Sequence, residues 1–145
     1  MKQQIVRHLL LLSVLVSIPL HAQESYAELT QAALETMWKS VDSVTYRKSL
    51  AMYEHAFALF PDSIEDIGLY KASVLAGYLK EKDKAFNYLN RLFQLSSKLP
   101  LSTNWELIIG KYAKDEYANL LSDPRWSDLK NKALKAKQTF YDGLK

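Results

Sequence analysis

Residues 49–61 read SLAMYEHAFALFP, and the spacing of residue types in this stretch is the strongest indication of the fold. Ser49, Tyr53 and Ala56 place small, aromatic and small side chains four and three positions apart, and Pro61 follows five positions later. Small residues allow two helices to cross closely, the aromatic ring fills the space beside the crossing, and proline stops the helix. The stretch therefore predicts a helix that crosses a neighbouring helix closely and ends before Pro61.

The same spacing recurs further along the chain. The second copy consists of Ala85, Leu89, Leu92 and Ser97. The helix before it carries the matching first-helix positions, which are Leu69, Ala72, Ser73 and Ala76. A helix pair leaves an apolar face that only a neighbouring pair can cover, so the repetition predicts a stack of pairs.

Capping residues mark where the helices begin. Ser25 with Glu28 and Thr103 with Glu106 have the capping-box spacing, and Asp123 stands directly before a proline. Glycine is scarce, and the connections between the marked segments are short, which favours antiparallel neighbours in an all-α fold. We expect about six helices, over residues 25–42, 45–60, 64–80, 82–97, 103–121 and 124–142, with Gly143 closing the last.

Two further segments carry a family resemblance. Residues 82–86 read KDKAF and residues 123–126 read DPRW. Together with the spacing above, they resemble divergent tetratricopeptide repeats of exported bacterial proteins. The resemblance is best over residues 46–129 and weak over 25–45. It implies a short right-handed superhelix of stacked pairs with residues 124–143 as a capping helix. The alternative is an up-and-down bundle closed around one axis.

The N-terminus is typical of a secretory signal. Arg7 precedes an apolar run over residues 9–20, and the small Ala22 follows it. We expect cleavage after Ala22, so that residues 1–22 are the signal peptide and 23–145 form one periplasmic or secreted domain. The run is shorter than the roughly 20 residues that span a bilayer. A permanent membrane anchor is therefore the lesser alternative.

The charge of the chain gives no indication of nucleic-acid binding. The sequence has 19 Lys and Arg residues and 16 Asp and Glu residues. Cleavage removes Lys2 and Arg7, which leaves 19 − 2 = 17 basic residues and a net charge of 17 − 16 = +1. Recognition of nucleic acid needs a concentrated basic face, so none is expected.

The inventory of reactive side chains argues against catalysis. His55 is the one histidine beyond residue 22, and the chain has no cysteine, which excludes Cys-His nucleophiles and the common His/Cys metal sites. The carboxylate neighbours Glu65 with Asp66 and Asp115 with Glu116 diverge on a helix. We expect the first pair at a helix start and the second on a solvated surface. The prediction is a protein that is not an enzyme, with no catalytic residue, metal or cofactor.

The resemblance also implies a binding site. In tetratricopeptide proteins the first helix of each pair lines an inner groove, which usually binds an extended peptide or a helix. Carried over by position, this groove is lined by Leu34, Trp38, Val41, Asp42, Ile67, Tyr70, Val74 and Tyr78, with Gly77 beside them. Trp38, Tyr70 and Tyr78 would anchor a partner. The alternative for Trp38 and Tyr70 is a place in the core.

The expected function is a non-catalytic adaptor that binds an unidentified protein or peptide in the bacterial cell envelope or outside the cell. One alternative is an accessory domain or subunit associated with a secreted hydrolase, because related segments occur beside catalytic domains. Another is a protein that binds a glycan or a small apolar ligand among the aromatic residues. That function would need an enclosed pocket rather than an open groove.

Overall fold

The structure, a computed structural model, describes residues 24–96, 105–111 and 113–144. These residues contain α-helices and one 3₁₀ helix but no strand, which confirms the all-α prediction. The elements are α2 (Tyr26–Met37), α3 (Ser43–Leu59), η1 (Pro61–Ser63), α4 (Asp66–Tyr78), α5 (Lys82–Ser96), α6 (Glu106–Ile109), α7 (Ala113–Glu116) and α8 (Pro124–Asp142). No helix in these ranges is long and apolar enough to cross a membrane. The predicted signal peptide and Thr103 lie outside the described residues.

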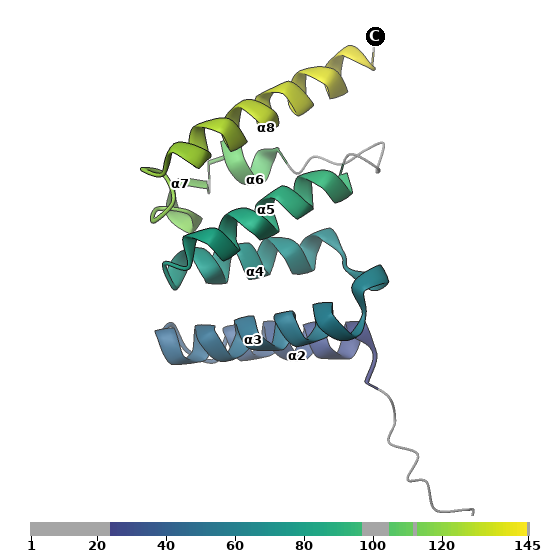
Figure 1. The fold of residues 1–145 in the computed structure, drawn as a ribbon, viewed down its shortest axis with the longest axis vertical. Coiled ribbons are helices and arrows are strands. Elements are labelled where there is room, and N and C mark those ends of the chain that lie inside the picture. The colour runs from purple at the N-terminus through teal and green to yellow at the C-terminus, as the bar shows by residue number, and fades with distance from the viewer. Residues whose placement is uncertain (1–23, 97–104, 112, 145) are drawn as a thin grey trace, which may run out of the picture.

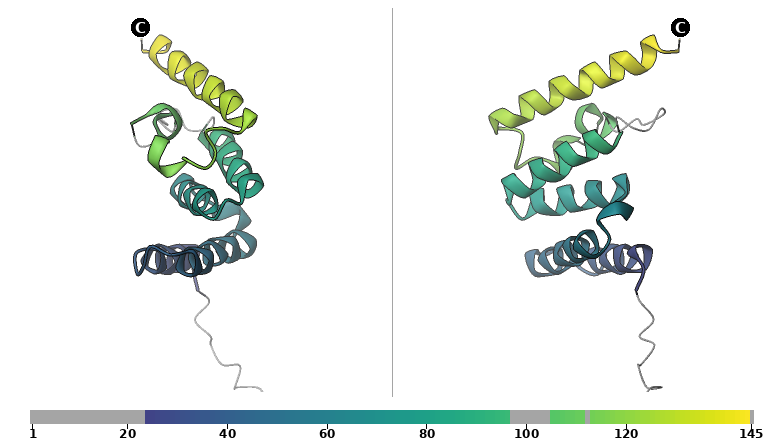
Figure 2. Two further views of the ribbon diagram at one scale, coloured as in Figure 1. Left: turned by 90° about the vertical axis from the view of Figure 1, so that its left-hand side faces the viewer. Right: turned by 45° about the vertical axis from the view of Figure 1, so that its right-hand side comes forward.

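The helices form three layers along the long axis of the molecule (Figure 1). The first layer is the α2–α3 pair, the second is the α4–α5 pair, and the third combines α6, α7 and α8. In Figure 1, α5 is inclined to α3 and α8 is inclined further still, and both views in Figure 2 show the same stacking. The described helices are therefore stacked in layers, of which the first two are pairs, and they do not close around one axis.

Asp42 separates the first two helices. Its carboxylate accepts a hydrogen bond of 2.8 Å from the backbone N–H of Thr45 and so caps α3. A cap residue needs an extended backbone, and Asp42 has φ −140° and ψ 161°. The predicted helix over 25–42 is therefore too long at its end, since α2 stops at Met37. Its start is as predicted, because Ser25 and Glu28 form a capping box.

The single helix predicted over 103–121 is wrong. Two short helices, α6 and α7, stand in its place, and Gly110 lies between them. The backbone of Gly110 is extended, with φ −75° and ψ 173°. A Cβ atom here would lie 2.2 Å from the carbonyl oxygen of Glu106, so a larger residue does not fit this backbone. The chain turns at this glycine.

The predicted start of α8 is confirmed. Asp123 accepts a hydrogen bond of 3.1 Å from the backbone N–H of Arg125, and Pro124 occupies the first turn of the helix. Proline is suited to this position, because the N–H that it lacks would have no partner in the first turn. Gly143 closes the helix as expected.

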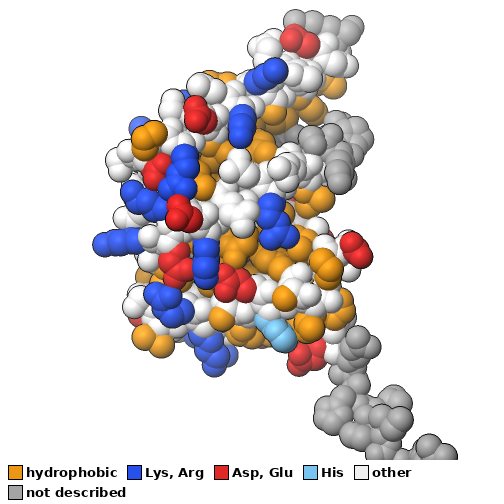
Figure 3. All heavy atoms as spheres, in the orientation of Figure 1, with side chains coloured by type: hydrophobic (Ala, Val, Ile, Leu, Met, Phe, Trp, Pro, Cys, Tyr) orange, Lys and Arg blue, Asp and Glu red, His pale blue; other side chains and the backbone are white. Residues whose placement is uncertain are grey.

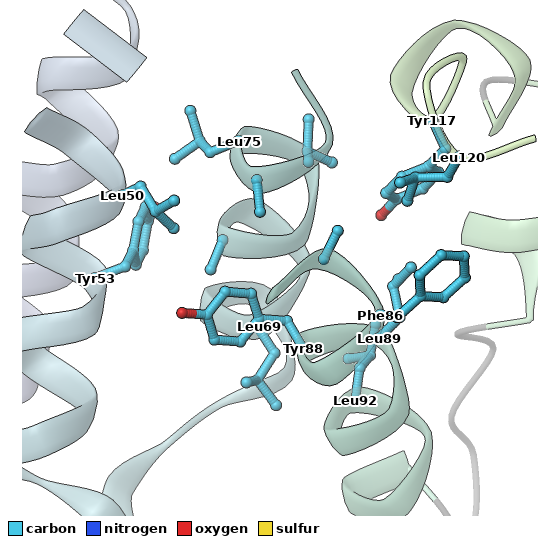
Figure 4. Packing of buried hydrophobic residues seen from close by; sticks show 14 of the residues in the cluster. Leu50, Tyr53, Leu69, Leu75, Phe86, Tyr88, Leu89, Leu92, Tyr117 and Leu120 are labelled. Carbon is cyan, nitrogen blue, oxygen red and sulfur yellow. The ribbon is translucent and has the colours of Figure 1, made fainter. Parts of the chain in front are cut away.

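The core fills the space between the layers. Figure 4 shows side chains from α3, α4, α5 and the segment around Tyr117 directed toward one another. The predicted small-aromatic-small positions Ser49, Tyr53 and Ala56 are all buried. The Ser49 hydroxyl donates a hydrogen bond of 2.7 Å to the carbonyl of Ala33 across the first pair. The spacing found in the sequence therefore marks the packing of α2 on α3.

Charged side chains gather on the side of the molecule where α3, α5 and α8 begin, at the left of Figure 3. They pair across layers. Arg47 of α3 contacts Glu81 at 2.6 Å, and Arg125 of α8 contacts Asp83 of α5 at 2.7 Å. Exposed pairs of this kind contribute little each, so we assign this network a minor role in stability.

Candidate binding groove

Three neighbouring hollows lie along helices α2, α4, α6 and α7. The first, the α2 hollow, has a volume of about 320 Å³ and contains Leu34 and Ile67 in its lining. The central hollow, of about 200 Å³, lies at the end of α2. The α6 hollow, of about 350 Å³, contains Leu107 and Glu116. Lys71 lines both the α2 and central hollows, and Glu116 lines both the central and α6 hollows, so the three hollows adjoin one another, and we refer to them together as the groove.

The central hollow is mostly apolar and aromatic. Its residues are Met37, Trp38, Val41, Tyr46, Lys71, Val74, Leu75, Tyr78 and Glu116. Trp38 is 72% exposed, Val41 is 90% exposed and Tyr78 is 45% exposed. The rings of Tyr46 and Tyr78 pack with their centroids 5.5 Å apart. Such a concentration of exposed apolar side chains is typical of an interaction surface.

Tyr70 holds the two charged residues of the groove in place. The Lys71 ammonium lies 4.8 Å from the centre of the Tyr70 ring and 6.0 Å from that of Trp38, which are cation–π distances. On the other side, the Tyr70 phenol donates a hydrogen bond of 2.5 Å to the Glu116 carboxylate. Burial, and then this bond to a carboxylate, raise the pKa of Tyr70, so it stays a neutral donor.

Most of the predicted groove residues do line these hollows. Trp38, Val41, Val74 and Tyr78 come together in the central hollow, Leu34 and Ile67 lie in the α2 hollow, and Tyr70 lies in the α6 hollow. Val74 is buried, so its place is the floor. The alternative that put Trp38 in the core is wrong, because its side chain is exposed.

Two predicted positions have structural roles instead. Asp42 is the cap of α3 and does not line any of the three hollows. Hydrogen bonds from Ser40 and then Thr45 lower the pKa of Asp42 to about 2. Gly77 is buried, and its carbonyl accepts a hydrogen bond of 3.1 Å from the Asn119 side chain. Gly77 thus belongs to the packing of α4 against the third layer.

Sequence reasoning missed Lys71, Tyr46 and Glu116. Lys71 could have been found, because it lies four positions after Ile67 and three before Val74 and therefore shares their helix face. Tyr46 comes from α3, which the resemblance assigned to the outer side. Glu116 was expected on a solvated surface, whereas it is half-buried and bonded to Tyr70. Its position depends on the break at Gly110.

The described residues contain one histidine and no cysteine. His55 is exposed on α3, and no group of three or more His, Cys, Asp or Glu residues in the described ranges could hold a metal ion. Comparison with protein-family models, curated proteins and solved structures gives no significant match for this chain.

Proposed function

We propose that this chain is an exported, non-catalytic adaptor whose groove binds a peptide segment of another protein. The observation that carries the proposal is the exposure of Trp38, Val41 and Tyr78 around the central hollow. Burying such side chains against a partner releases water from apolar surface, and tryptophan and tyrosine supply much of the binding energy at protein interfaces.

The shape of the groove favours an elongated ligand. The three hollows adjoin along α2, α4 and α7, and each is partly open to solvent. Sites for small ligands usually enclose most of the ligand surface, which these hollows would not do. An extended peptide directs alternate side chains to the same face and could therefore place every second side chain in neighbouring hollows. We therefore favour a peptide over a glycan or a small apolar ligand.

Membership of the tetratricopeptide family and export are parts of the same proposal. The layered helix pairs and the burial of Ser49, Tyr53 and Ala56 support the first. The basic start, apolar run and small residue within residues 1–22 support the second. A periplasmic or secreted adaptor would meet its partner outside the cytoplasm.

Affinity capture from the cell envelope tests the proposal. A Trp38→Ser, Val41→Ser double variant should lose a partner that the wild-type chain retains, because both side chains are exposed in the groove. The matched control is Leu134→Ser, Tyr141→Ser, which changes two exposed apolar residues of α8 and should retain the partner. Circular dichroism should show that both variants stay folded. Equal recovery with the groove variant would contradict the proposal.

A further inference from the structure

The central hollow contains two opposite charges that do not pair. Lys71 and Glu116 both line it and both are half-buried. Neither forms an ion pair with the other or with any other described residue. The outer face differs, because there Arg47 and Lys84 both pair with Glu81. A half-buried charge has lost part of its hydration, so an oppositely charged ligand group can compensate it.

Each of these two charges also lines a different neighbouring hollow. Lys71 is shared with the α2 hollow, whereas Glu116 is shared with the α6 hollow. The exposed apolar side chains of Trp38 and Val41 belong to the central hollow that both charges line. A ligand lying along the groove would therefore meet a positive charge on one side of an apolar site and a negative charge on the other.

We propose that the central hollow takes one apolar side chain of an extended peptide, with an acidic residue of the peptide placed toward Lys71 and a basic residue toward Glu116. The inference rests on the proposed function and specifies its ligand. The volume of about 200 Å³ suits a single side chain, because sites for drug-sized ligands measure about 300–1,000 Å³.

Tyr70 fixes the positions of both charges, which should make the groove selective for peptides with one order of charges. Its ring holds the Lys71 ammonium, and its phenol holds the Glu116 carboxylate, so both charges are positioned before the ligand arrives. Fixed charges contribute more to the choice of partner than to affinity, because they repel peptides with the wrong order of charges. Reversing one charge should therefore change which peptides are selected.

A random peptide library displayed on phage tests the inference. The wild-type chain should enrich peptides in which an apolar residue has an acidic residue two positions to one side and a basic residue two positions to the other, because alternate side chains of an extended peptide share a face. Lys71→Glu should weaken binding of these peptides about tenfold and, on reselection, enrich basic residues in place of the acidic one. Lys130→Glu reverses an exposed charge on α8 and is the matched control, which should bind as the wild type does. Fluorescence of Trp38, which is exposed whereas Trp105 and Trp126 are buried, measures the affinities.

The outcomes separate the inference from the proposed function. Enriched peptides that the Trp38→Ser, Val41→Ser variant no longer binds support the groove. If those peptides carry no charge order, or if Lys71→Glu binds them as the wild type does, the inference fails and the groove stands. If the library yields no peptide that depends on Trp38 and Val41, the proposed function fails and the inference with it.

Discussion

In the α2–α3 and α4–α5 layers small side chains are buried where the paired helices meet, whereas aromatic rings join α8 to the other segments of the third layer. Ala33 and Ser49 meet in the first layer, and Ala76 and Ala85 are fully buried in the second. In the third layer, Trp105 packs on Phe140 with ring centroids 5.0 Å apart, and Tyr117 packs on Trp126 at 5.4 Å. Small residues let long helices pack along their length, which the short α6 and α7 cannot do.

The stability of the third layer therefore depends on its contacts with the neighbouring layers. The helices α6 and α7 have four residues each, far fewer than an isolated helix needs to be stable. Contacts to α4 hold α7 in place, including the bonds from Tyr70 to Glu116 and between Ser73 and Tyr117. Because Glu116 also lines the groove, the least regular layer completes the candidate binding site.

The largest effect should follow from a cavity in the second layer. Leu89 of α5 is fully buried, so Leu89→Ala should lower the free energy of unfolding by about 2–5 kcal/mol. Urea denaturation measures the change. Leu134→Ala on α8 is the control, and its effect should be small because Leu134 is exposed. Similar losses for the two variants would mean that the second layer is not the centre of stability.

A smaller loss of stability should follow from adding a side chain at Gly110, in the turn of the third layer. In Gly110→Ala the new Cβ would collide with the Glu106 carbonyl, and we expect a loss of about 1–3 kcal/mol. Hydrogen exchange should show the amides of α8 opening more often while those of α3 stay protected. Gly143→Ala is the control, because its Cβ would lie 3.5 Å from the nearest carbonyl oxygens. Unchanged exchange in α8 would contradict the dependence of the third layer on this turn.

Removing one hydroxyl at the contact between the second and third layers should lower the free energy of unfolding. The Tyr117 phenol and the Ser73 hydroxyl lie 2.9 Å apart and are both buried. Tyr117→Phe should therefore cost about 1 kcal/mol of unfolding free energy. A double-mutant cycle with Ser73→Ala measures the coupling. Strictly additive effects of the two changes would show that the bond does not join the layers.

The smallest effect on stability is expected at acid pH, where the capping aspartates of the first and third layers should respond in the same way. Hydrogen bonds from Ser40 and Thr45 lower the pKa of Asp42, and bonds from Arg125 lower the pKa of Asp123, each from 3.8 to about 2. A lowered pKa in the folded state gives stability that is present above pH 3.8 and is lost as pH falls toward about 2.

Neutral caps should reduce this acid sensitivity. In Asp42→Asn or Asp123→Asn the amide can still cap the helix, so stability at neutral pH should change little while its fall below pH 3.8 becomes shallower. Urea midpoints recorded against pH measure this. Ser63→Ala in the exposed turn η1 removes no titratable group and should leave the pH profile as in the wild type. An unchanged profile in both cap variants would assign the acid sensitivity to other carboxylates.

Much of the fold could be predicted, because the decisive signals are local. The spacing of Ser49, Tyr53 and Ala56 identified α3, and Asp123 marked the start of α8. The groove was predicted in part, since Trp38 and Tyr78 do line one hollow. It was not predicted that Lys71 and Glu116 line this hollow without forming an ion pair with each other. Whether two charges form an ion pair depends on which residues from distant segments approach them.

From the residues alone one can read that this chain forms helix pairs, where most of the helices begin, and that it has few of the reactive groups common in enzymes. These follow from backbone caps and from apolar spacing, which act within a few residues. Only the tertiary structure decided that Gly110 breaks the fifth predicted helix and that Glu116 reaches Tyr70. It also decided that Lys71 and Glu116 share a hollow without pairing. The reason is that burial and pairing are set by contacts between segments far apart in the sequence, such as Tyr70 with Glu116, 46 positions away.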